Sequence, residues 1–98
     1  MVEVIWTEQA IEDINNIAEF ISKNSFRYAQ IQVEKFFQTT STLENNPLIG
    51  RQVPETLDKS IRELIIGTYR IIYKVKTLKI LILTVHHSSR SMDNNTQI

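Results

Sequence analysis

The spacing of apolar residues changes once along this chain of 98 residues, and that change limits the possible folds more than any other feature. Between residues 7 and 43, apolar side chains recur every three or four positions, which is the period of an amphipathic helix. From about residue 60 to residue 87 they follow the two-residue period of a strand. The segment NNPLIGRQVPE separates the two patterns, and its prolines and glycine favour turns. We therefore expect a helical part followed by a sheet.

Two helices are expected in the first half of the chain. Thr7 can cap a helix that runs to about Lys23, and Ser25 can cap a second one. The link KNSF between them is so short that the helices should lie antiparallel as a hairpin. The residues expected on the buried faces are Ala10, Ile14, Ile17, Ala18 and Ile21 in the first helix, and Ala29, Val33, Phe36 or Phe37, Thr40 and Leu43 in the second.

Four strands should accompany the helices. VEVIW at the start is β-branched and alternating, and three further strands are expected near residues 60–66, 69–76 and 79–87. Gly67 and the pair Thr77-Leu78 mark the turns between the last three. KILILTV is apolar on both faces, so it should be a central strand. The predicted fold class is α+β, in the order β-α-α-β-β-β, with an antiparallel-rich sheet packed on one face by an N-terminal helical hairpin.

Length and residue types restrict the class of protein further. A chain this short can bury one core, so residues 1–90 should form a single domain and the polar residues 91–98 a flexible tail. The sequence has no cysteine, and its two histidines are adjacent, so we expect no disulfide, metal site or cofactor. No apolar run reaches the ~20 residues that span a bilayer, and the start does not have the form of a signal peptide. A soluble, cytoplasmic protein with no membrane contact is expected.

Charge is divided unevenly between the two halves. Residues 1–50 carry three cations and seven acids, a net charge of −4, whereas residues 51–98 carry eight cations and four acids, a net charge of +4. This polarity favours contact of the second half with a polyanion or an acidic partner. Solvation of a strand-rich surface explains the same charges equally well.

Several cations of the second half fall within the apolar strands. We expect Arg70 and Lys74 from one strand, Arg62 from its neighbour and a histidine from the last strand to converge on the open face of the sheet as a cationic concavity. Exposed strand cations contribute little to stability, so Arg62 and Arg70 should be dispensable for the fold. Alternatively, Arg70 pairs with a carboxylate of the preceding loop.

The alternation of strand side chains separates some neighbours. Arg62 and Glu63 point to opposite faces and cannot share one site, and the same holds for His86 and His87. One histidine is therefore expected to be structural. Tyr73 lies on the apolar face of its strand and should belong to the core.

Four segments, VIWTEQAIEDINNIAEFI, NNPLIGRQVPE, IRELIIGTYRIIYKV and ILTVHHSSR, resemble motifs of the RelE/ParE superfamily, the toxins of type II toxin–antitoxin modules. The resemblance runs from about Val4 to Arg90, and the pair RELIIGTYRIIY and ILTVHHSSR is its most specific part. It implies the element order predicted above, growth inhibition and plasmid stabilization. It also implies a cognate antitoxin that neutralises the toxin in a hetero-oligomeric complex.

The superfamily carries two activities on one fold. ParE-like members inhibit DNA gyrase, whereas RelE-like members are endoribonucleases that cleave messenger RNA on the ribosome without a metal. Cleavage requires a base, an acid and cations that stabilise the phosphoryl transition state. The resemblance offers Arg62 and Arg70 as cations, and Glu63 or His87 as the group that exchanges protons.

The end of the last strand favours the ParE-like branch. Where some nucleases place a histidine and a tyrosine, this chain has Ser88 and Ser89, which exchange protons poorly near neutral pH. The ending VHHSSR instead resembles the pattern VxHxxR of ParE-like sequences. We therefore expect a gyrase inhibitor with no firmly assigned catalytic residue; the alternative is a ribosome-dependent mRNA endoribonuclease that uses Arg62, Arg70 and His87. The target-binding residues expected from the resemblance are Arg51, Arg62, Arg70, His87 and Arg90.

Overall fold

A computed structural model describes residues 1–88 of the chain. The predicted tail at 91–98 and Arg90 lie outside the described residues. The elements are β1 (Glu3–Trp6), α1 (Glu8–Ser22), α2 (Phe26–Ser41), a short 3-10 helix η1 (Thr42–Glu44), β2 (Arg51–Gln52), β3 (Ile61–Ile66), β4 (Tyr69–Val75) and β5 (Lys79–His87). This order confirms the predicted α+β class. No helix within residues 1–88 is long and apolar enough to cross a membrane.

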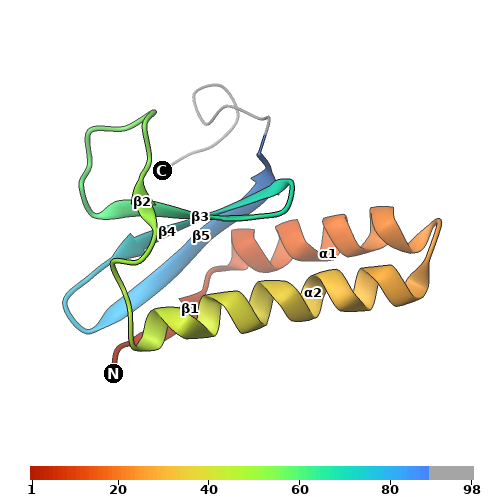
Figure 1. The fold of residues 1–98 in the computed structure, drawn as a ribbon, viewed down its shortest axis with the longest axis horizontal. Coiled ribbons are helices and arrows are strands. Elements are labelled where there is room, and N and C mark those ends of the chain that lie inside the picture. The colour runs from red at the N-terminus through yellow and green to blue at the C-terminus, as the bar shows by residue number, and fades with distance from the viewer. Residues whose placement is uncertain (89–98) are drawn as a thin grey trace.

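The strands form one mixed sheet in the order β1-β5-β4-β3-β2 (Figure 1). β1 pairs parallel with β5, and the other neighbours pair antiparallel. β5 thus lies between β1 and β4, as its apolar sequence predicts. Strand β2 was not predicted, because it has only two residues and lies in a segment dominated by turn formers.

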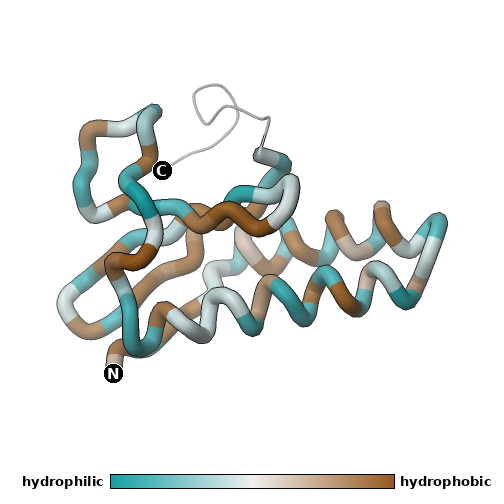
Figure 2. Tube along the Cα trace, viewed as in Figure 1, coloured by the Kyte–Doolittle hydropathy of each residue, from teal (hydrophilic) through white to brown (hydrophobic). Residues whose placement is uncertain are grey.

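The two helices pack side by side on one face of the sheet (Figure 1). Thr7 and Ser25 cap them as predicted: their side-chain oxygens accept hydrogen bonds from the backbone N–H groups of Ala10 and Tyr28, at 3.2 and 3.1 Å. Figure 2 shows apolar positions recurring along both helices with hydrophilic positions between them. The buried core between helices and sheet consists of Ala10, Ile14, Phe36, Leu43, Ile71, Tyr73, Ile80, Ile82 and Val85.

Asp13 joins α1 to the sheet at a point where the β4–β5 register shifts. Its Oδ2 accepts hydrogen bonds from the Thr84 hydroxyl and from the backbone N–H of Val85, the latter at 3.0 Å. The register shift lies between Ile72 and Tyr73. A buried backbone N–H without a partner destabilises a fold, so Asp13 stabilises this irregular segment. The spacing of apolar residues along the sequence does not predict this contact.

The opposite face of the sheet is covered only in part. Val53, from the loop after β2, packs with Ile61 and Ile72 in a second, smaller buried cluster. Ile65, on the same face of β3 as Ile61, is half exposed. The loop formed by residues 53–60 therefore covers one end of this face and leaves the other end accessible.

The segment before β2 is held to the sheet by Tyr73. The Tyr73 hydroxyl accepts a hydrogen bond from the Gly50 N–H at 2.9 Å and donates one to the Pro47 carbonyl at 3.0 Å. Burial raises the pKa of this hydroxyl, which therefore keeps the proton that it donates. Tyr73 is fully buried, as predicted for a core residue.

Candidate functional site

Arg70 lies at the centre of a buried cluster of ion pairs, which we call the Arg70 cluster: Arg51, Glu55, Glu63 and Arg70. The Arg70 Nε donates to Glu63 Oε1 at 2.7 Å, and its Nη2 also contacts Glu63. Its Nη1 and Nη2 donate to the two carboxylate oxygens of Glu55, at 2.8 and 2.9 Å. Arg51 Nε contacts the second oxygen of Glu63. The Arg70 guanidinium thus binds two carboxylates, that of Glu63 in β3 and that of Glu55 in the loop before β3.

Burial distinguishes this cluster from a surface salt bridge. The Glu63 side chain is 0% exposed and the Arg70 side chain 6% exposed. Hydrogen bonds to Glu55 raise the pKa of Arg70, although burial acts in the opposite direction. The arginine therefore stays charged, and its charge compensates that of a carboxylate which water does not reach.

The predicted convergence of Arg62, Arg70 and Lys74 is wrong. In the β3–β4 ladder Arg62 lies opposite Tyr73, whose side chain faces the helices. Arg70 lies on the other face of the sheet, together with Glu63 and Ile72. The alternation that separates Arg62 from Glu63 therefore also separates Arg62 from Arg70. Arg70 is buried, so the prediction that it is an exposed cation is wrong as well. It does pair with a loop carboxylate, as the alternative has it, although the loop of Glu55 precedes β3 and not β4.

The two other cations of the predicted concavity have local partners. Arg62 Nη1 donates to the carbonyl oxygens of Gly50 and Leu48, at 2.7 and 3.3 Å, so it fixes the segment before β2. Lys74 Nζ lies 3.6 Å from Asp58 Oδ2. Among residues 1–88 the structure contains no cationic concavity of the expected kind, and no group of three or more His, Cys, Asp or Glu that could hold a metal.

The histidines occupy different environments, as predicted. His86 is buried and lies opposite Arg70 in the β4–β5 ladder, while His87 is exposed at the end of β5. The His87 ring packs edge-on against Tyr69, with 5.8 Å between centroids. Both histidines line a cavity of about 360 Å³ beside α1.

Arg51 and Arg90 complete the set of predicted site residues. The Arg51 side chain is 66% exposed although it contacts Glu63, so it is accessible to a partner. Arg90 lies outside the described residues. The predicted site residues are therefore separated within residues 1–88. Arg70 is buried, Arg62 lies on the helix side of the sheet, and Arg51 and His87 are exposed.

Comparison with known proteins places this geometry in a family. The family model described as "ParE toxin of type II toxin-antitoxin system, parDE" matches residues 4–92. No curated protein sequence gave a match. A solved structure of the chromosomal ParDE TA system from P. aeruginosa is 20% identical, covers 89% of this chain and 96% of that chain, and superposes with a TM-score of 0.74.

A second solved structure, of the toxin-antitoxin complex RelBE2 from Mycobacterium tuberculosis, is 25% identical, covers 88% of this chain and 96% of that chain, and has a TM-score of 0.59. The resemblance to the RelE/ParE superfamily, and to its ParE-like branch, is confirmed. This chain belongs to the ParE toxin family of type II toxin–antitoxin systems.

Proposed function

We propose that this toxin inhibits DNA gyrase in the cytoplasm, and that a cognate antitoxin neutralises it in a hetero-oligomeric complex. Membership of the ParE family and the ParDE-like fold support the proposal. A fold alone does not decide between activities, so the choice between gyrase and messenger RNA rests on the residues of the site.

The observation that carries the choice is the burial of Arg70. A cation that stabilises a phosphoryl transition state has to contact the reacting phosphate. Arg70 is 5% exposed and its donors are directed at Glu55 and Glu63. Arg62, the second candidate cation, lies on the other face of the sheet and donates to backbone carbonyls. The two arginines cannot meet at one phosphate in this arrangement, which favours a binding toxin over a nuclease.

Target recognition would then depend on the accessible residues. The Arg51 side chain is two-thirds exposed, and His87 is exposed at the end of β5. We propose both, together with Arg90, as contacts to the target. Arg62 and Arg70 would contribute by holding the segment before β2 and the loop after it in position.

The first prediction separates the two target classes. Purified toxin is expected to inhibit supercoiling by gyrase, and to leave an end-labelled message intact in a coupled translation reaction. His87→Gln should keep appreciable toxicity, because glutamine retains hydrogen bonding and a binding contact needs no proton transfer. Loss of a general acid or base would instead lower the rate by about 100-fold to 10,000-fold. Messages cut within ribosome-occupied codons by the wild type but not by His87→Gln would establish the nuclease alternative.

The second prediction concerns the antitoxin. Leu48 and Ile49 are each 60% exposed and Ile65 is 51% exposed, which leaves apolar surface for a partner segment to cover. The product of the neighbouring gene is expected to raise the melting temperature of the toxin. A partner at ~100 times its Kd stabilises by about 2.7 kcal/mol, or roughly 10 °C or more for a domain of this size. An antitoxin shortened to its DNA-binding head is the control. An unchanged melting temperature with the full antitoxin, and normal growth of cells expressing the toxin alone, would contradict the proposed module.

A further inference from the structure

The cavity of about 360 Å³ beside α1 has the features of a small-ligand site. Asp13, Asn16 and Phe20 of α1 line it, and their spacing of three or four positions places them on one side of the helix. From the sheet it is lined by Tyr69 at the start of β4 and His87 at the end of β5, which lie opposite each other in the ladder. Small-molecule sites begin at ~300 Å³, so a cavity of this volume suits a small ligand.

Aromatic rings from both elements face a ligand in this cavity. The Tyr69 and His87 rings pack edge-on at 71°, with 5.8 Å between their centroids. Phe20 of α1 is 69% exposed, so its ring is accessible as well. The face of an aromatic ring is electron-rich and attracts cations, in particular flat ones that can stack on it. The rings therefore favour a ligand that is planar, positively charged or both.

Asp13 determines the charge that fits the cavity. Its carboxylate accepts hydrogen bonds from the Gln9 side chain, the Thr84 hydroxyl and the Val85 backbone N–H, and all three donors are neutral. Within residues 1–88 it forms no salt bridge, and no lysine or arginine lines the cavity. A partly buried carboxylate without an opposite charge favours a cation beside it. A carboxylate has about four acceptor positions, so one position on Oδ1 remains for a ligand.

Anionic and neutral ligands fit the cavity less well. The α1 helix carries Glu8, Glu12, Asp13 and Glu19 and has no lysine or arginine, so the potential along this side of the cavity is negative. A phosphate group would lie beside Asp13 without a lysine or arginine to bind it in the part of the chain that the structure describes. A neutral aromatic ligand could stack on the rings, but it would leave the charge of Asp13 uncompensated.

We propose that this cavity binds a small organic cation with a guanidinium head group. A guanidinium is planar, stacks on aromatic faces, and directs its N–H groups outward in its own plane. In the cavity its N–H groups donate to the Asp13 Oδ1 and to the side-chain carbonyl of Asn16, while its face lies against the ring of Phe20. The proposal goes beyond gyrase inhibition and neutralisation by an antitoxin, and it depends on neither.

The third prediction compares two probes of the same shape. N-butylguanidinium is a cation and N-butylurea is its neutral counterpart. We expect the cation to bind the whole toxin with a Kd on the order of 1 mM or below, and at least about tenfold more tightly than the urea. Amide NMR shifts of the labelled protein, titrated at about pH 8, above the usual titration range of histidine, measure both affinities. The shifts should be largest at Asn16, Val85 and His87.

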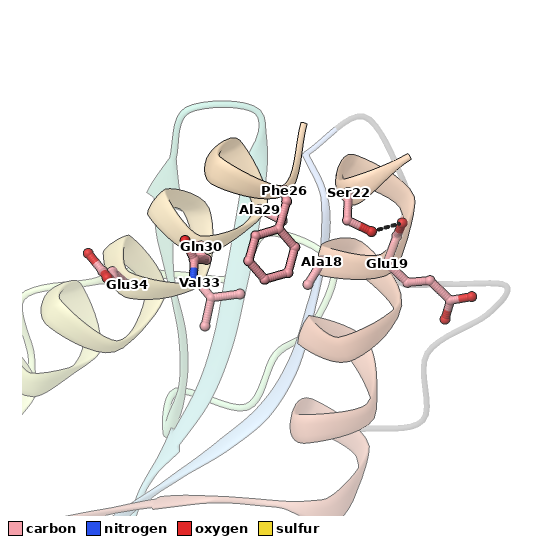
Figure 3. A pocket seen from close by; sticks show the side chains of 8 residues that line it. All are labelled: Ala18, Glu19, Ser22, Phe26, Ala29, Gln30, Val33 and Glu34. Carbon is pink, nitrogen blue, oxygen red and sulfur yellow. Dashed lines mark hydrogen bonds between the residues drawn. The ribbon is translucent and has the colours of Figure 1, made fainter. Parts of the chain in front are cut away.

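Two variants test the contacts in the cavity. Phe20→Ala should weaken binding of butylguanidinium by about two- to fivefold, the usual effect of one exposed cation–π contact. Phe26→Ala is its matched control, because Phe26 is also 69% exposed but does not line this cavity. Its ring projects between α1 and α2, opposite Ala18 (Figure 3). Asp13→Asn should reduce the preference for the cation, and Glu12→Gln, at an exposed residue outside the lining, should retain it.

Asp13 also holds β5, so a melting curve of Asp13→Asn has to accompany its titration; the two probes and Phe20→Ala decide the question if that variant does not fold. Equal affinity of the two probes would overturn the proposal. Equal losses in Phe20→Ala and Phe26→Ala, or in Asp13→Asn and Glu12→Gln, would overturn it too, since they would indicate general attraction to the helices. Adenosine monophosphate that shifts the same amides, with no binding of butylguanidinium, would assign the cavity to an anionic ligand instead.

Discussion

Replacement of Arg70 by alanine is expected to lower the free energy of unfolding by about 3–5 kcal/mol, the usual cost of removing one partner from a buried ion pair. The side chain is 6% exposed and donates to two carboxylates. Without it, Glu63 remains fully buried with Arg51 as its remaining partner within the Arg70 cluster. A loss of that size lowers the melting temperature by roughly 12 °C or more in a domain of this length. Thermal and urea denaturation, followed by circular dichroism, measure the effect.

Two further variants distinguish the buried ion pair from a general effect of losing an arginine. Arg27 is exposed on α2, so Arg27→Ala should change stability by no more than about 0.5 kcal/mol. The double variant Arg70→Met/Glu63→Leu removes both charges and fills the space with apolar atoms, so it should be more stable than Arg70→Met alone. An Arg70→Ala protein as stable as Arg27→Ala would show that the cluster contributes little.

Because Arg70→Ala is expected to be unstable, a loss of toxicity in this variant would have two possible causes. A non-toxic Arg70→Ala variant could have lost a contact to its target or could have unfolded, and growth assays cannot tell these outcomes apart. Arg51→Ala gives the cleaner test of target binding, because two-thirds of its side chain is exposed. Stability and toxicity have to be measured on the same preparations.

The secondary structure was largely predictable because the signals for it are local. Thr7 and Ser25 cap the helices, the alternation along β4 separates Tyr73 from Arg70, and KILILTV identifies an interior strand. Each signal depends on residues within a few positions of one another. β2 was not predicted, because its two residues carry no periodic pattern of their own and form a strand only by pairing with β3.

The candidate site was less predictable because it depends on register and on the path of a loop. The residue of β4 that lies opposite Arg62 determines whether Arg62 and Arg70 share a face of the sheet. That residue is Tyr73, so the two arginines lie on opposite faces. The burial of Arg70 depends on Glu55, whose position follows from the course of residues 53–60 over the sheet. A basic residue within an apolar strand is a signal of such pairing, since an unpaired cation is costly to bury. The sequence does not specify which carboxylate supplies the partner.

Gly50 illustrates the same distinction between local and distant causes. The sequence around this glycine predicts a turn, yet within residues 1–88 the positive φ angle belongs to Gly67, at 58°. Gly50 is required for a different reason. A Cβ atom there would lie 2.5 Å from the carbonyl oxygen of Glu63 and 2.6 Å from the Tyr73 hydroxyl. Both neighbours belong to the sheet, one as strand backbone and the other as a fully buried ring.

Gly50→Ala is therefore expected to destabilise the protein by roughly 2–5 kcal/mol, from overpacking and from loss of the hydrogen bonds at this segment. Gly67→Ala is the matched control: its Cβ would meet no atom within 4 Å, so its cost should be that of the left-handed backbone alone, about 1–2 kcal/mol. In Gly50→Ala/Tyr73→Phe the ring no longer carries the oxygen that the new methyl group meets. The double variant should therefore lose less stability than the two single variants together, as measured by urea denaturation. Strict additivity would show that the methyl group is accommodated by movement of the loop, and that the contact with Tyr73 does not determine the residue at position 50.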